Sequence, residues 1–180
     1  MRKIIYFDMD GVLVDFPGKA KEIQATSKTQ FWKQVSQIGL SFWTTMNEIK
    51  GVKDIVLSLD LNDVEVNVLS KLPITDTANA LAGKALWLSQ HYPNIFTHVI
   101  LTKGNKRAFA KNCLLIDDKE TNVESWNLKG GKAYLFKGDI KELTEVIKNY
   151  LKECERKEVY QLEAYGLEEQ TNEHKFRNRT

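Results

Sequence analysis

Short apolar segments alternate with longer amphipathic ones along the chain. Five of the short segments are rich in β-branched or aromatic residues and are as long as buried strands: residues 3–7, 64–69, 98–101, 114–116 and 132–136. Near-continuous apolar strands of this kind are typical of a parallel sheet that is covered on both faces. The pattern therefore predicts an α/β fold with a doubly wound, Rossmann-like parallel sheet and right-handed crossovers.

Helical periodicity fills the intervals between these segments. Residues 78–91 carry an apolar stripe with helical spacing, and Thr75-Asp76 before them is a candidate N-cap. A second stripe begins near Asp139 and runs to residue 151. The longest interval lies between the first and second strands, and it contains helical patterns at residues 20–40 and 52–61.

These patterns divide the chain into three parts. We expect an α/β core formed by residues 1–16 and 62–150, with a small helical cap at residues 17–61 inserted after the first strand. Residues 151–180 are rich in both acidic and basic side chains and are expected to form a charged C-terminal helix or tail. An oligomer contact made by this tail, such as a homodimer, stays open.

Composition excludes several classes of protein. Lys and Arg number 26 against 24 Asp and Glu, a net charge of +2, which does not favour a dedicated nucleic-acid or membrane surface. The two cysteines, Cys113 and Cys154, lack the CxxC spacing of a zinc site and are too few for a disulfide framework. The N-terminus lacks a signal-peptide pattern, and no apolar run is long enough to span a bilayer. We expect a cytoplasmic protein.

Charged and hydroxyl side chains follow four of the predicted strands. They are Asp8 and Asp10 after the first strand, Ser70 and Lys71 after the second, Lys103 and Lys106 after the third, and Asp117 and Asp118 after the fourth. The carboxyl ends of parallel strands meet at one edge of the sheet, where α/β proteins bind ligands. Four converging carboxylates repel one another, and Mg²⁺ together with a phosphate group would relieve that repulsion. The pattern indicates phosphoryl transfer with a carboxylate nucleophile.

The same residues resemble the motifs of the haloacid dehalogenase (HAD) superfamily. Residues 8–16, DMDGVLVDF, resemble its first motif, Ser70 the second, Lys106 the third and residues 114–118, LLIDD, the fourth. Within the superfamily the chain is most similar to 5'(3')-deoxyribonucleotidases. That likeness includes a Phe-Trp pair in the insertion, the text GKALWLSQHY before the third strand and an Asn soon after the paired aspartates, here Asn122.

The resemblance implies roles for individual residues. Asp8 would be the nucleophile and a metal ligand, and Asp10 would be the general acid and base, its backbone carbonyl binding Mg²⁺. Asp118, with Asp117 beside it, would complete the metal site. The remaining implied contacts are to phosphate by Ser70, Lys71 and Lys106, and to the base, the sugar or the phosphate by Phe16, Phe42, Trp43 and Lys84. Lys103 stays an alternative to Lys106 as the lysine of the third motif.

The implied function is a Mg²⁺-dependent phosphomonoesterase that acts on small (deoxy)nucleoside monophosphates through a phospho-aspartate. Two alternatives keep the chemistry and change the substrate: a polynucleotide 3'-phosphatase, or a phosphatase for another small metabolite. A third is a binding protein that keeps the fold without catalysis. The preferred base, the 5' or 3' position of the phosphate and the choice of deoxy or ribo sugar stay open.

Overall fold

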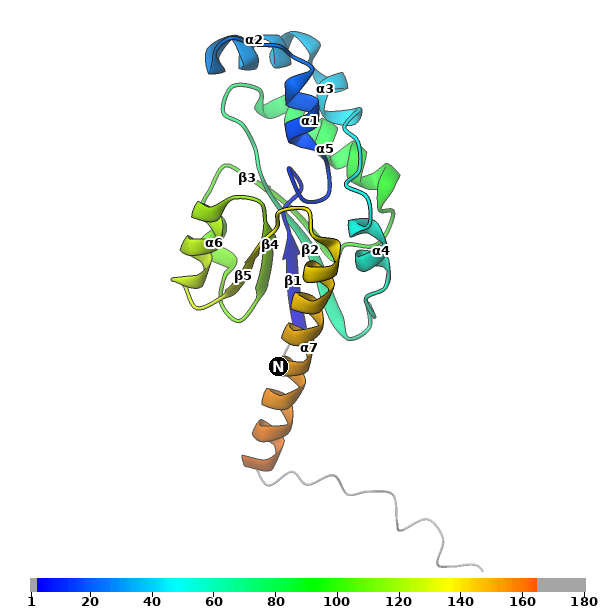
Figure 1. Ribbon diagram of the computed structural model, residues 1–180, viewed down its shortest axis with the longest axis vertical. Helices are drawn as coiled ribbons and strands as arrows, with labels where there is room; N and C mark the ends of the chain where they lie inside the picture. The colour runs from blue at the N-terminus through cyan, green and yellow to red at the C-terminus, as the bar shows by residue number, and fades with distance from the viewer. Residues whose placement is uncertain (1–2, 165–180) are drawn as a thin grey trace, which may run out of the picture.

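A computed structural model describes residues 3–164, with side chains described as far as Tyr160. A five-stranded sheet lies at its centre, and every pair of neighbouring strands is parallel (Figure 1). The strands are β1 (Lys3–Phe7), β2 (Val64–Lys71), β3 (His98–Thr102), β4 (Leu114–Asp117) and β5 (Lys132–Leu135). The predicted α/β fold with a parallel sheet is confirmed, and each strand matches its predicted segment to within two residues.

The order of the strands decides which residues meet at the edge of the sheet. It is β3-β2-β1-β4-β5, so β1 lies between β2 and β4. Phe7 at the end of β1 is paired with Val68 of β2 on one side and with Ile116 of β4 on the other. The residues that follow these three strands therefore emerge side by side, although they are far apart in the sequence.

The helices differ more from expectation than the strands do. They are α1 (Phe16–Lys21), α2 (Lys28–Ile38), α3 (Leu40–Thr44), α4 (Val52–Leu57), α5 (Thr77–His91), η1 (Lys106–Phe109), α6 (Glu120–Asn127) and α7 (Ile140–Ala164). The single helical stretch predicted at residues 20–40 is wrong, because Gly39 at φ 66° separates α2 from α3 and residues 22–27 separate α1 from α2. Helix α6 is not anticipated by the sequence pattern.

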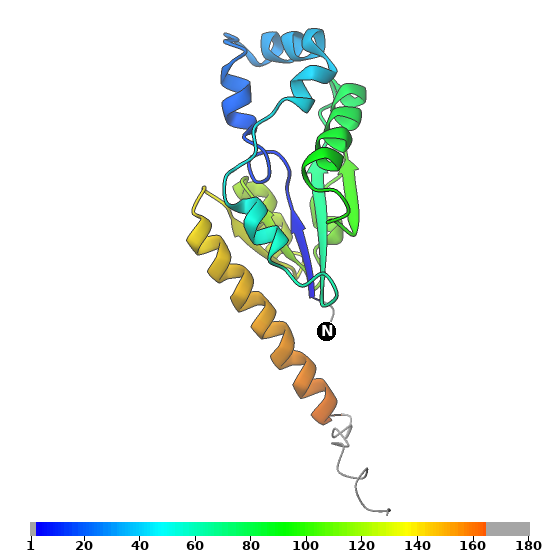
Figure 2. The same ribbon diagram turned by 90° about the vertical axis from the view of Figure 1, so that its right-hand side faces the viewer.

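Helices α1, α2 and α3 lie beyond the carboxyl edge of the sheet, whereas α4 lies lower, alongside α7 (Figures 1 and 2). A Cβ atom added to Gly51 at the start of α4 would lie 3.1 Å from the side chain of Ile140 in α7. The part of the insertion nearest β2 thus packs on the core. The boundaries of the cap stay a prediction.

Helix α7 covers the sheet with a buried stripe formed by Leu143, Ile147, Tyr150 and Cys154. Beyond Cys154 the helix continues past the sheet as far as Ala164 (Figure 2). This agrees with a helical start to the predicted segment 151–180, of which residues 165–180 lie outside the described part of the chain. Among residues 3–164, no helix combines the length and apolar character required to cross a bilayer.

Helix α3 packs tightly on α5. The contact is closest at Gly83, where an added Cβ atom would lie 2.3 Å from Cβ of Trp43. An aromatic cluster formed by Phe16, Phe31, Trp32, Phe42 and Trp43 extends this contact into α1 and α2. Gly83 therefore sets the distance between the aromatic cluster and the helix that follows β2.

Substitution of Gly83 by Ala tests this contact, because the sign of the change in the free energy of unfolding depends on it. Gly→Ala in an ordinary helix interior stabilises a protein by up to about 1 kcal/mol. We expect Gly83→Ala to lower the free energy of unfolding by about 2 kcal/mol instead, because the added methyl group overpacks the contact with Trp43. Urea denaturation measures the change, and Ser89→Ala on an exposed position of the same helix is the control. An increase in stability for Gly83→Ala would contradict the packing described.

Candidate active site

Three carboxylates converge where β1 and β4 end. Asp8 follows β1, Asp117 closes β4 and Asp118 comes next in the chain. One carboxylate oxygen from each lies within 4.8 Å of those from the other two, and the side chains of Asp8 and Asp117 are buried. Oxygen ligands grouped in this way could hold a divalent metal ion.

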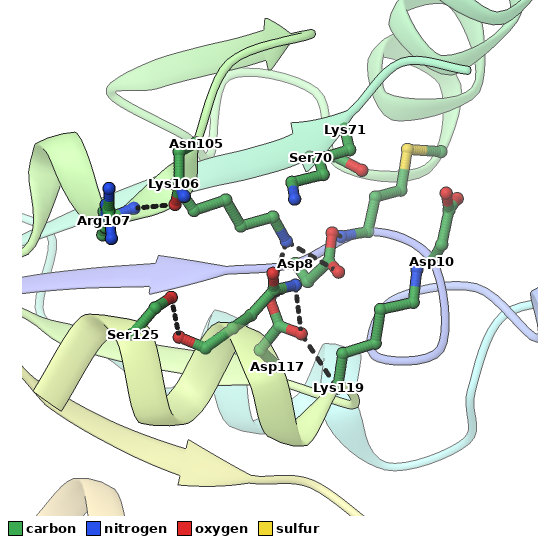
Figure 3. Close-up of polar contacts among 12 residues, drawn as sticks. Asp8, Asp10, Ser70, Lys71, Asn105, Lys106, Arg107, Asp117, Lys119 and Ser125 are labelled. Carbon is green, nitrogen blue, oxygen red and sulfur yellow. Dashed lines mark hydrogen bonds and ion pairs between the residues drawn. The ribbon is translucent and has the colours of Figure 1, made fainter. Parts of the chain in front are cut away.

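Lys106 offsets the negative charge of this group. Its Nζ atom lies 2.7 Å from Oδ2 of Asp8 and 2.7 Å from Oδ2 of Asp117, and the side chain is only 1% exposed (Figure 3). Burial by itself lowers the pKa of Lys106, but the attraction of the two carboxylates outweighs it, so the pKa is raised above its ordinary value. Lys103, the alternative considered from the sequence, is exposed and does not take part in these contacts.

Asp117 serves mainly to hold other groups in place. Its Oδ1 atom accepts hydrogen bonds from the backbone N–H of Lys119 at 2.9 Å and from Nδ2 of Asn122 at 2.9 Å. Its Oδ2 atom accepts from Lys106 at 2.7 Å and again from Asn122 at 3.0 Å. Both oxygens are thus occupied, and Asp117 fixes Lys106 against Asp8.

Asp118 has a carboxylate oxygen that is free to bind a further partner. Its Oδ1 atom is buried and has no hydrogen-bond partner among the described residues. Burial and, secondly, the charge of Asp8 raise the pKa of Asp118 to about 6. The ionised form of a buried carboxyl group with an unpartnered oxygen lowers the stability of the fold unless a cation binds to it.

A second buried lysine organises the other half of the site. Nζ of Lys84, on α5, lies 2.6 Å from Oδ2 of Asp10, 3.0 Å from Oγ of Ser70 and 3.0 Å from the carbonyl oxygen of Lys71. Lys84 is fully buried. It was expected from the sequence to contact substrate, and the structure places it among the polar groups that follow β1 and β2.

The environment of Asp10 shifts its pKa upward. Burial raises the pKa of Asp10, Lys84 opposes the shift, and the nearby charge of Asp8 adds to it, so that the pKa lies above its ordinary value. Its Oδ1 atom is buried without a hydrogen-bond partner among the described residues. The side chain of Lys119 extends toward Asp10 (Figure 3). The Asp10 carboxylate is not one of the three grouped carboxylates of Asp8, Asp117 and Asp118. The metal contact predicted for the backbone carbonyl of Asp10 stays a prediction.

The side chain of Lys71 does not join these contacts. Ser70 and Lys71 are consecutive residues of β2, and successive side chains of a strand point to opposite faces. Ser70 is buried beside Lys84, whereas Lys71 is exposed. Lys71 contributes its backbone carbonyl to Lys84, and the phosphate contact predicted for its ammonium group stays a prediction.

The predicted base-contacting aromatics lie on the cap side of Lys84. The ring centre of Trp43 is 5.4 Å from Nζ of Lys84, and Phe16 stacks on Trp43 with their ring centres 6.1 Å apart. Phe42 and Trp43 are buried by their neighbours, and Phe16 is partly exposed. Of the three, Phe16 is the one with surface available to a ligand.

Asp76 was not anticipated as a site residue. It precedes α5 as predicted, but its side chain makes no capping bond to the helix. Instead, Oδ2 accepts a hydrogen bond of 2.7 Å from Nε1 of Trp43, and Oδ1 accepts one of 2.7 Å from Nδ2 of Asn79. Asp76 thus holds the ring that lies over Lys84, a long-range contact that no local spacing in the sequence signals.

Comparisons with known proteins bear on the fold. No family model and no curated protein sequence matches the chain. Among solved structures, a HAD family enzyme from Bacteroides thetaiotaomicron in complex with magnesium and inorganic phosphate has a TM-score of 0.52 at 15% identity, with 79% of this chain and 99% of that chain covered. The fold is that of HAD hydrolases.

Two further solved structures are similar to this fold. YfnB from Bacillus subtilis, named as a HAD-hydrolase and bound to magnesium, has a TM-score of 0.54 at 12% identity over 82% of this chain and 99% of that chain. A HAD-superfamily hydrolase from Ehrlichia chaffeensis has a TM-score of 0.51 at 12% identity over 84% of this chain and 99% of that chain. Likeness at this level of identity shows the HAD-like fold alone.

Gly11 makes room for Asp118, and a matched pair of glycines tests this. Gly11 and Gly130 both have φ +82°, but a Cβ atom on Gly11 would lie 2.4 Å from Oδ2 of Asp118, whereas one on Gly130 meets nothing within 4 Å. We expect Gly130→Ala to cost about 1 kcal/mol of stability, the cost of the left-handed backbone alone. Gly11→Ala should cost about 2 kcal/mol more, because it also displaces Asp118. Equal urea midpoints for the two variants would contradict this account.

The raised pKa of Asp118 predicts a pH-dependent stability. Below the unfolded-state value of 3.8 the group is protonated in both states, and the fold loses stability as the pH rises toward about 6. Without metal, Asp118→Asn should therefore be more stable than the wild type at pH 8, by on the order of 2 kcal/mol, and the difference should vanish below pH 4.

Urea denaturation at both pH values measures this difference, and Asp54→Asn at an exposed position is the control. Millimolar Mg²⁺ should reverse the order at pH 8, because only the wild type retains the full set of ligands. A pH-independent difference between the two proteins would show that Asp118 is not the titrating group.

Proposed function

We propose that the protein is a Mg²⁺-dependent phosphomonoesterase that dephosphorylates (deoxy)nucleoside monophosphates through a phospho-aspartate. The observation that carries the proposal is the pair of carboxylates that follow β1, each held by its own buried lysine. Asp8 is bound to Lys106, and Asp10, with its raised pKa, is bound to Lys84. Carboxyl groups whose environments differ in this way suit two roles, nucleophile and general acid.

The residues present fit a magnesium ion. Asp8 and Asp118 would hold it, because Asp118 has an unpartnered buried oxygen and shares the acidic group with Asp8. Asp117 is already saturated by Lys106, Asn122 and a backbone N–H. The magnesium and phosphate found in the Bacteroides thetaiotaomicron enzyme support this reading. When bound, Mg²⁺ neutralises charge on the phosphoryl oxygens.

The reaction then follows from the side chains. A carboxylate oxygen of Asp8 attacks phosphorus, the bond from phosphorus to the ester oxygen breaks, and Asp10 gives its proton to the departing alcohol. In the second half, a water attacks the phosphorus of the phospho-aspartate, Asp10 takes a proton from that water, and the Asp8–phosphorus bond breaks. Lys106 remains beside Asp8 throughout, and Lys84 holds Asp10 and Ser70 in place. The Ser70 hydroxyl, which accepts from Lys84, can donate to a phosphoryl oxygen.

The aromatic cluster supports a nucleotide as substrate. Phe16 presents a partly exposed ring beside Trp43, and Trp43 lies over the lysine that contacts Asp10. A planar base can stack on an exposed aromatic face. The resemblance of the DMDGVLVDF segment to that of the 5'(3')-deoxyribonucleotidases favours the same class of substrate.

Two substitutions separate the roles of the paired carboxylates. Asp8→Asn should lower the rate of phosphate release from dUMP or dTMP by at least about 10³-fold, because the nucleophile is lost. Asp10→Asn should also be slow, but with an activated aryl phosphate, which needs no acid for its leaving group, it should accumulate phosphorylated enzyme. Rapid acid quenching and mass spectrometry of the Asp8 peptide measure that accumulation.

Asp54→Asn, at an exposed position of α4, should retain wild-type turnover and serves as the control. Phosphate release by Asp8→Asn at the wild-type rate would disprove the phospho-aspartate mechanism. Turnover of other phosphate esters but of no nucleoside monophosphate would keep the chemistry and refute the substrate.

A further inference from the structure

A hollow of about 440 Å³ opens between α2 and the segment that joins β2 to α5. It is separate from the carboxylates described above. Its lining consists of Lys28, Thr29, Trp32, Lys33, Ser36 and Thr75. Five of these residues come from one helix, α2, which begins at Lys28, and the sixth lies five residues after Ser70.

The charge of this hollow is entirely positive. Lys28 and Lys33 are both exposed, and neither forms an ion pair with any residue of the described chain. No carboxylate lines the hollow, and the remaining polar side chains are hydroxyls. Two unpaired ammonium groups beside hydroxyl donors favour an anion with several acceptor oxygens, as a phosphate group has.

Trp32 gives the hollow an aromatic wall. Its ring is partly exposed, stacks on Trp43 at 6.5 Å with 18° between the ring planes, and meets Phe31 edge-on at 5.0 Å. A ring supported on two sides is held rigidly and can stack with a base at little entropic cost. The combination of an aromatic ring and cations is typical of nucleotide-binding surfaces.

The hollow is connected to the carboxylates by a short series of contacts. Trp32 stacks on Trp43, the Trp43 ring centre lies 5.4 Å from Nζ of Lys84, and that atom lies 2.6 Å from Oδ2 of Asp10. Together these three separations place the Trp32 ring centre no more than about 15 Å from the Asp10 carboxylate. A ligand with a scissile phosphate near Asp8 and a further nucleotide attached could reach both.

We infer that this hollow binds a second phosphate of the substrate, with the adjacent base against Trp32. The inference rests on the proposed function and extends it: the preferred substrates carry a phosphate beyond the scissile one, as nucleoside bisphosphates and terminally phosphorylated dinucleotides do. Lys28 and Lys33 are then specificity-determining residues, and a nucleoside monophosphate reacts without using them.

Charge reversal of the two lysines tests the inference on turnover. For Lys28→Glu combined with Lys33→Glu, we expect kcat/KM for a terminally phosphorylated dinucleotide to fall at least tenfold, mainly through KM, and kcat/KM for a nucleoside monophosphate to change less than twofold. A nucleoside 3',5'-bisphosphate distinguishes a nearby second phosphate from one in the next nucleotide. Lys111→Glu combined with Lys129→Glu, at exposed positions outside the hollow, is the matched control. Equal losses in the two double variants would overturn the inference.

A binding experiment keeps this test independent of catalysis. A dinucleoside monophosphate has an internal phosphodiester and no phosphomonoester, so it can occupy the hollow without being a substrate. It should quench tryptophan fluorescence of the wild-type protein, with an affinity that falls as NaCl increases. The Lys28/Lys33 variant should lose both the affinity and its dependence on salt, whereas an unchanged titration would refute the site even if the protein proved to be a phosphatase of another kind.

Discussion

The group of aspartates at the carboxyl edge of the sheet depends on the compensation of buried negative charge. A carboxylate transferred from water to a protein interior is strongly destabilising unless a partner of opposite charge accompanies it. Lys106 accompanies Asp8 and Asp117, and Lys84 accompanies Asp10, and both lysines are almost completely buried. The two ammonium groups make it possible for the acidic residues to lie close together away from solvent.

The arrangement of the sheet explains why these charges meet. Because β1 lies between β2 and β4, Asp8 has Ser70 on one side and Asp117 on the other without any long loop to bring them together. The lysines approach from the elements that follow β2 and β3, namely α5 and η1. The same chemistry could not be assembled if the strand order placed β1 at an edge.

The strands and the acidic residues could be predicted from the sequence because short apolar runs and their terminal polar residues are local signals. The burial of Phe42 and Trp43 and the bond from Trp43 to Asp76 could not, since they depend on how α3 packs on α5. Helix α6 could not be predicted either, because its eight residues, ETNVESWN, are mostly polar and too few to show helical periodicity. Strand β2 continues through Lys71, two residues beyond its predicted end. Because successive side chains of a strand point to opposite faces, Ser70 and Lys71 then lie on different faces of the sheet.

The bond between Trp43 and Asp76 has a mechanical consequence. It fastens α3 to the segment that precedes α5, and Gly83 brings the same two helices into close contact about two turns further on. A hinge that separated α3 from α5 would leave Oδ2 of Asp76 and the indole N–H of Trp43 without these partners. Mechanically, α3 therefore belongs with α5, and an opening above Asp8 and Asp118 would move α1 and α2 relative to both helices.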